Sequence, residues 1–103
     1  MKFNMKNAKE MREKYEKVLL DKSEEFLSKV KNKVESTIDI IYKTNLNTDR
    51  VIIELEEIRE VINKSEDKLK IYKKELENLG YRVSIDEDYR GGKLSKLNII
   101  IKW

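Results

Sequence analysis

Glycine and proline are distributed so that nothing interrupts the first 79 residues of this chain. Proline is absent from all 103 residues, and glycine stands only at positions 80, 91 and 92. These two residue types are the strongest breakers of regular helix. The long N-terminal part can therefore form extended helices, and the tight turns are expected in the last quarter.

The composition favours elongated helices over disorder. Charged residues make up 42% of the chain, far above the usual value of about 25%, and hydrophobic residues make up 39%. The hydrophobic residues are regularly spaced and rich in Ile, Leu and Val, whereas disordered segments are poor in such residues. A chain of this length predicts a single domain, residues 1–103.

A first helix is predicted over about residues 5–43. Its hydrophobic residues recur at spacings of three and four, as expected for one buried stripe, and Asn4 or Asn7 is the expected N-cap. The stripe comprises Ala8, Met11, Tyr15, Leu19, Phe26, Val30, Val34, Ile38 and Ile41. Ser23 interrupts it, so a break near residues 21–23 is an alternative. We favour one continuous helix, because no glycine or proline stands there.

A second helix is predicted over about residues 49–79, with Thr48 as its N-cap and Gly80 at its C-terminal cap. Its stripe comprises Ile52, Leu55, Ile58, Ile62, Leu69, Tyr72, Leu76 and Leu79. The short link between the helices indicates an antiparallel helical hairpin. In that arrangement Ser65 lies beside Phe26, and Ser23 lies beside Leu69.

Beyond Gly80 the hydrophobic period changes from helical spacing to two, which predicts a β-hairpin over about residues 81–103 with its turn at Gly91-Gly92. One face carries Tyr81, Val83, Ile85, Leu97, Ile99, Ile101 and Trp103. A lone hairpin is marginal in water, so we expect this face to pack near Met5, Ala8, Met11 and Tyr15. Residues 1–5 also alternate and are a candidate third strand.

The predicted fold class is α+β and mainly α: a long antiparallel helical hairpin followed by a C-terminal β-hairpin packed at the open end of the helices. Surplus hydrophobic residues on the helices further predict a homodimer with four helices. These residues are Val18, Leu20, Leu27, Ile40, Val51, Ile53, Val61 and Ile71.

The residue types present exclude several chemistries. The chain has no cysteine and no histidine, which removes disulfides, thiolate nucleophiles, imidazole bases and the usual zinc ligands. Asp86, Asp88 and Gly91 match a calcium loop, but Arg90 and Leu97 stand where ligands are required. We therefore expect no metal, no cofactor and no enzymatic activity. No apolar run is long enough to cross a membrane, so a cytoplasmic protein is expected.

The outer face and tip of the hairpin form the candidate partner-binding surface, because Arg and Tyr are enriched at binding hot spots. The candidate residues are Arg82, Tyr89, Arg90, Lys93, Lys96, Ile100 and Lys102. We expect them to lie near the basic residues 1–22, at the same end of the molecule. The alternative is an ordinary charged face that keeps sheet edges from pairing.

The layout resembles small accessory proteins of bacteriophages and prophages. The resemblance rests on long Lys/Glu-rich helices, the Leu79-Gly80-Tyr81 hinge and the terminal Ile99-Ile100-Ile101-Lys102-Trp103. Heavy use of Lys, Asn and Ile is similar to that of AT-rich Gram-positive hosts. The resemblance implies a non-enzymatic protein, such as an anti-CRISPR-like inhibitor of host defence, and carries over no site residues. The alternatives are a nucleic-acid or nucleotide binder that uses the basic hairpin end, and a structural helical assembly protein.

Overall fold

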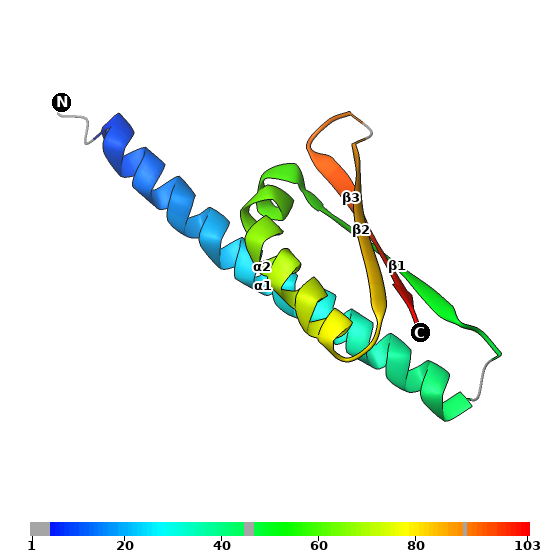
Figure 1. The fold of residues 1–103 in the computed structure, drawn as a ribbon. Coiled ribbons are helices and arrows are strands. Elements are labelled where there is room, and N and C mark those ends of the chain that lie inside the picture. Colours follow the sequence, from blue (N-terminus) through cyan, green and yellow to red (C-terminus); the bar gives the residue numbers. More distant parts are fainter. Residues whose placement is uncertain (1–4, 45–46, 90) are drawn as a thin grey trace.

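The computed structural model describes residues 5–44, 47–89 and 91–103, and it confirms the α+β, mainly helical fold class. Five elements follow one another along the chain (Figure 1). They are α1 (Ala8–Thr44), β1 (Arg50–Ile58), α2 (Arg59–Asn78), β2 (Arg82–Tyr89) and β3 (Leu94–Lys102).

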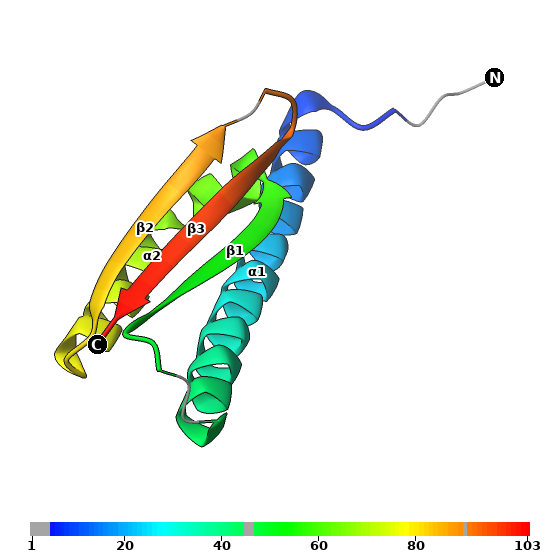
Figure 2. The same ribbon diagram turned by 90° about the vertical axis from the view of Figure 1, so that its right-hand side faces the viewer.

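The three strands form an antiparallel sheet in the order β1-β3-β2. Because β1 and β2 both run antiparallel to the central β3, they are parallel to each other, and α2 is the crossover between them. Figure 2 shows both helices behind the sheet, so one face of the sheet is covered and the other is open. The core fills the space between the covered face and the helices.

The predicted β-hairpin is confirmed as β2 and β3. Gly91 and Gly92 adopt φ values of 75° and 83°, which the turn requires and which side chains disfavour. Most of the expected inner face is buried or partly buried against the helices. Trp103 is the exception: it was expected in the core but is 45% exposed, because it lies beyond the last residue of β3.

Residues 50–58 form a strand, and the expected helix over residues 49–79 therefore begins only at Arg59. The β-branched run Val51-Ile52-Ile53 favours a strand. Ile53 is 2% exposed and pairs with Ile99 of β3. The third strand stabilises a hairpin that would be marginal alone. The alternative third strand, residues 1–5, lies almost wholly outside the described residues.

The start of α2 has no cap of its own. Ile58 occupies the N-cap position and makes no side-chain cap hydrogen bond. Instead, the backbone N–H of Arg59 donates to the carbonyl oxygen of Lys93 at 2.9 Å. Thr48, the expected N-cap, bonds through its hydroxyl to the backbone carbonyl of Arg50, in the turn before β1. The boundary between strand and helix is thus set by a contact from the hairpin turn.

The two helices run in the same direction, which corrects the expected antiparallel pairing. Lys64 pairs with Glu16 at 3.6 Å, and Lys68 pairs with Glu24 at 3.8 Å, so both sequences advance together. The physical reason is β1, which returns the chain along the molecule before α2 begins (Figure 1).

The small residues that interrupt the two stripes mark a close contact between the helices. The Ser65 hydroxyl lies 3.4 Å from the carbonyl oxygen of Ser23, and both serines are buried. The expected antiparallel arrangement instead places Ser23 beside Leu69 and Ser65 beside Phe26. A larger side chain at either serine would push the helices apart.

Helix α1 is continuous from Ala8 to Thr44, so the alternative break near residues 21–23 does not occur. Asn7 is its N-cap, with the side-chain oxygen accepting from the Glu10 amide at 2.9 Å; Asn4 lies outside the described residues. Residues 8–18, here called the arm, are all exposed. The arm projects beyond α2 and the sheet in Figure 1, and the molecule is 70 Å long.

Several contacts expected for the hairpin are therefore absent from the described structure. Met5, Met11 and Tyr15 were expected to lie under the hairpin, but each is more than half exposed. The sheet instead packs on α2 and on the part of α1 that follows the arm, where Phe26, Val30 and Val34 are buried.

The end of α2 follows the prediction at Gly80, which has a φ of 98°. The Gly80 N–H donates to the carbonyl of Glu77, and the Tyr81 N–H donates to the carbonyl of Leu76. These two bonds define a Schellman cap, which ends the helix and turns the chain into β2.

Candidate interaction surface

The open face of the sheet carries alternate residues of all three strands. They are Arg50, Ile52, Glu54 and Glu56 of β1; Arg82, Ser84, Asp86 and Asp88 of β2; and Lys96, Asn98, Ile100 and Lys102 of β3. The strand register places them in rows that cross the sheet, and the rows differ sharply in charge.

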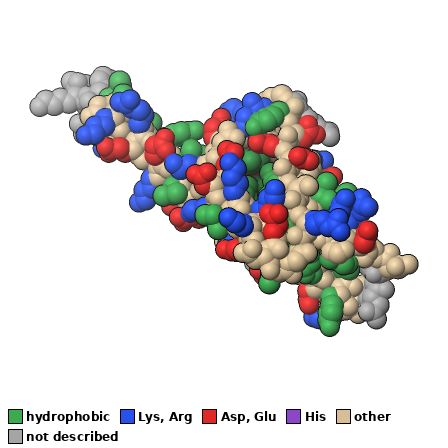
Figure 3. All heavy atoms as spheres, viewed as in Figure 1, with side chains coloured by type: hydrophobic (Ala, Val, Ile, Leu, Met, Phe, Trp, Pro, Cys, Tyr) green, Lys and Arg blue, Asp and Glu red, His purple; other side chains and the backbone are tan. Residues whose placement is uncertain are grey.

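One end of the open face is a basic row. Lys102 of the central strand is directly opposite both Arg50 of β1 and Arg82 of β2. Like charges opposite one another destabilise a sheet. Arg50 contacts the neighbouring Asp49 at 3.4 Å, while Arg82 and Lys102 make no ion pair with any described residue. Figure 3 shows Lys and Arg side chains gathered near this end.

The next row is mainly apolar and the two rows after it are acidic. Ile52 lies opposite Ile100, and Ile52 is 56% exposed. The acidic half of the face then comprises Glu54, Glu56, Asp86 and Asp88 on the outer strands, around Asn98 and Lys96 of β3. Basic and acidic groups are thus separated along the strands, by about 7 Å per row.

Two polar residues of β3 lie within the acidic half. The ammonium of Lys96 contacts a carboxylate oxygen of Glu54 at 3.2 Å. The side-chain oxygen of Asn98 is buried and has no hydrogen-bond partner in the described part of the chain, at a position opposite Glu54 and Asp86. Lys96 thus offsets the charge of Glu54.

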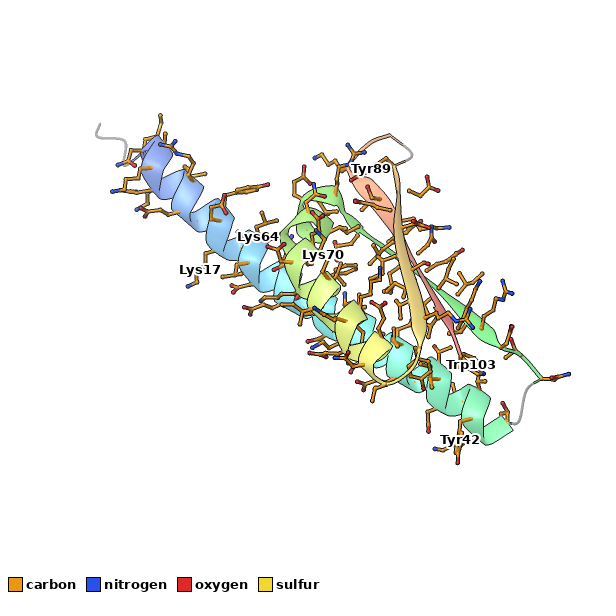
Figure 4. The ribbon with its side chains drawn as sticks, in the orientation of Figure 1. Lys17, Tyr42, Lys64, Lys70, Tyr89 and Trp103 are labelled. Atoms are coloured by element: carbon orange, nitrogen blue, oxygen red, sulfur yellow. The ribbon has the colours of Figure 1, made fainter. Side chains whose placement is uncertain are left out.

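The structure divides the candidate residues that the sequence predicted. Arg82, Ile100 and Lys102 lie together at the basic end, whereas Lys96 lies in the acidic half. Tyr89 and Lys93 lie at the far end of the hairpin, and Arg90 is outside the described residues. Figure 4 shows Tyr89 and Trp103 at opposite ends of the sheet.

Basic character is therefore also divided. Lys93 lies near the first helix as expected, because it lines a hollow together with Tyr15 and Lys22. Arg82 and Lys102 do not share that end, which corrects the expectation of one basic end. Arg50 and Ile52 also lie on the open face but are not among the residues predicted from the sequence. A helix over residues 49–79 would not place them on the sheet.

Tyr89 has partners within the molecule. The Arg59 guanidinium lies over the Tyr89 ring, 4.4 Å from its centroid, and the Tyr89 hydroxyl donates to Glu87 at 2.6 Å. This hydrogen bond raises the pKa of Tyr89 above its usual value. The Arg59 contact ties the hairpin to the start of α2, so Tyr89 has a structural role in addition to being a candidate binding residue.

No group of three or more Asp or Glu residues in the described ranges is arranged to hold a metal ion. None of the helices described is long and apolar enough to cross a membrane. No protein-family model, curated protein or solved structure matches the chain.

Proposed function

We propose that this protein binds a partner protein stoichiometrically through the open face of its sheet. The observation that supports the proposal is the separation of charge on that face. The basic row stands at one end, four acidic side chains stand at the other, and Ile52 and Ile100 lie between them. Such a pattern fits a partner with the reverse order of charge and sets the orientation of binding.

A protein partner fits this face better than a nucleic acid. A nucleic acid presents phosphate along its whole length, so it would meet Glu54, Glu56 and Asp86 beside the basic row. The open face also carries no aromatic side chain among the described residues, whereas single-stranded nucleic acids are usually held by stacking on aromatic rings. An acidic or phosphate-bearing ligand restricted to the basic row is the second candidate.

The more specific version of this proposal is a phage-type inhibitor of host defence that acts in the host cytoplasm. A protein of 103 residues with a charge-patterned sheet can block a larger partner without chemistry of its own. Its test is the plating efficiency of a phage on a bacterium carrying an active defence system, with and without expression of this protein.

Homodimer formation belongs to the same proposal. The sheet covers part of the hydrophobic surplus that predicted a dimer, since Ile53 and Val61 are buried. Val18 remains exposed in the arm, on the same helix face as Met11 and Tyr15. Leu20 is also exposed, on the opposite side of the helix. A second copy would cover the stripe that includes Val18. Sedimentation at high concentration tests this, because a mass near the 12.4 kDa of one chain would reject the dimer.

Binding through the open face is tested with two charge-reversal variants in pull-downs from a nuclease-treated lysate of an AT-rich Gram-positive bacterium. R50E/R82E/K102E reverses the basic row, and E56K/D86K reverses part of the acidic half. The matched control, K29E/K33E/K74E, makes the same change in net charge as the first variant on exposed helix positions. Circular dichroism establishes that each variant is folded.

If the proposal is correct, the unchanged protein captures a partner protein even after nuclease treatment. Neither open-face variant should capture this partner, and the control variant should still capture it. Capture that disappears with nuclease and falls steeply with salt would support a nucleic-acid binder instead. Capture that both open-face variants retain would show that the open face is not the binding surface.

A further inference from the structure

A pocket of about 420 Å³ lies between the C-terminal parts of α1 and α2, away from the open face of the sheet. Its wall combines aliphatic side chains with three tyrosines and three carboxylates. These are Tyr42, Tyr72 and Tyr81, and Glu35, Asp39 and Glu75. None of the described residues that line the pocket is a lysine or an arginine. Its volume is within the range of about 300–1,000 Å³ that is usual for small-ligand sites.

The direction of the helices adds to the negative potential of the pocket. Because α1 and α2 are parallel, both of their C-terminal ends point toward this end of the molecule, and a helix C-terminus carries partial negative charge. The last turn of α2 contains no basic residue. In α1, Lys43 pairs with Asp39 at 2.9 Å. Glu35 and Glu75 have no ion-pair partner within the described ranges.

Tyr72 provides a separate indication of a ligand. Its side chain is 6% exposed and lines the pocket, and its hydroxyl is buried with no hydrogen-bond partner among the described residues. A buried hydroxyl without a partner is costly. Burial, and then the charges of Glu35 and Glu75, raise the pKa of Tyr72 to about 12. The phenol is therefore neutral at physiological pH, and its oxygen can accept a hydrogen bond.

The Tyr72 ring already attracts one cation. The ammonium of Lys31 lies 5.3 Å from the ring centroid, within the range of a cation–π contact. Lys31 does not line the pocket. The ring thus already makes one contact with an alkylammonium group, while Glu35 and Glu75 make no ion pair with any described residue.

We propose that this pocket binds a primary alkylammonium group. The ammonium would lie between Glu35, Glu75 and the Tyr72 oxygen, and its carbon stem would pack on Val34, Ile38 and Leu76. A free polyamine and the lysine side chain of a protein both carry this chemistry. The site shares no residue with the open face and does not depend on its function.

The test is a titration of the ¹⁵N-labelled protein with n-butylammonium chloride, followed by NMR. We expect saturable shifts at residues around the pocket, and no comparable shifts with 1-pentanol, which has a similar shape and no charge, or with sodium chloride. E35Q/E75Q should bind about tenfold more weakly, since each lost carboxylate removes a close attraction. The matched control E13Q/E25Q, which removes two exposed carboxylates elsewhere on α1, should bind as the unchanged protein does.

Further measurements test the role of the Tyr72 hydroxyl and distinguish a free polyamine from a lysine side chain as the natural source of the ammonium group. Tyr72→Phe keeps the ring and removes the hydroxyl, and it should weaken binding by a smaller factor than E35Q/E75Q. Spermidine binding more tightly than N-acetyl-lysine methylamide would identify a free polyamine, and the reverse order a lysine side chain. Equal shifts with pentanol, unchanged binding in E35Q/E75Q, or no shifts near the pocket would each overturn the proposal.

Discussion

The two halves of α1 carry the same kind of hydrophobic stripe, and only one half is covered. In the arm, Met11, Tyr15 and Val18 are exposed, whereas Phe26, Val30 and Val34 further along are almost fully buried. The covered half lies under the sheet and beside α2, and the arm extends past both (Figure 1). Hydrophobic spacing thus identifies residues that share a face, but it does not say whether another element covers them.

The difference has an energetic consequence. A short helix without tertiary contacts is marginal in water below about 12–15 residues. The arm is helical because it continues the hydrogen-bond ladder of the covered half, so it avoids the cost of nucleation. Its stability should therefore be local, whereas that of the covered half should be the stability of the whole domain.

The largest expected effect comes from removing one aromatic side chain from each half. Phe26→Ala should lower the free energy of unfolding by about 3–5 kcal/mol, because it leaves a cavity in the core. Tyr15→Ala should change it by less than about 0.5 kcal/mol, because Tyr15 is 53% exposed. Urea denaturation followed by circular dichroism measures both. A large loss in Tyr15→Ala would show that the arm is covered in solution, as a dimer requires.

A smaller effect is expected at the contact between Ser23 and Ser65. Ser23→Leu should cost about 1–3 kcal/mol, because the carbonyl of Ser23 is in contact with the Ser65 hydroxyl and no space remains for a larger side chain. Ser36→Leu, on an exposed position of the same helix, is the matched control and should be nearly neutral. Equal losses in the two variants would mean that helix propensity, and not helix packing, sets the cost.

The same contrast explains how much of the fold could be predicted. The continuous α1, the cap at Gly80 and the β-hairpin depend on local signals, and the sequence predicts all three. The sequence does not predict strand β1, because Ile52, Leu55 and Ile58 fit a helical spacing. These residues form a strand because they pair with β3, which is distant in sequence. The start of α2 depends on a carbonyl of Lys93 that is distant in sequence.

The candidate surface was predictable only in part for the same reason. Arg82, Ile100 and Lys102 were identified, because the hairpin alternation places them on one face. Arg50 and Ile52 could not be added without β1, and the basic row exists only where all three strands meet. The separation from the acidic half likewise depends on the strand register, which no local pattern specifies.

A local effect is expected at the start of the arm. Asn7→Ala removes the side-chain acceptor for the Glu10 amide, a cap usually worth about 1 kcal/mol. Amides in the arm should exchange with solvent about fivefold faster, as measured by hydrogen exchange, while amides near Val30 keep their rates. If both regions exchanged faster by the same factor, the arm would unfold only together with the domain, and the division of α1 into two halves would be wrong.

The smallest expected effect is at the ion pair that joins the end of the arm to α2. Lys64 and Glu16 lie 3.6 Å apart, but both side chains are substantially exposed, so solvent and salt weaken their attraction. A double-mutant cycle with Glu16→Gln and Lys64→Met should give a coupling of about 0.2–0.5 kcal/mol that disappears at high salt. A coupling well above 1 kcal/mol that persists at high salt would mean that this pair is shielded from solvent. The boundary between the covered half and the arm would then lie closer to the N-terminus than the exposed fractions indicate.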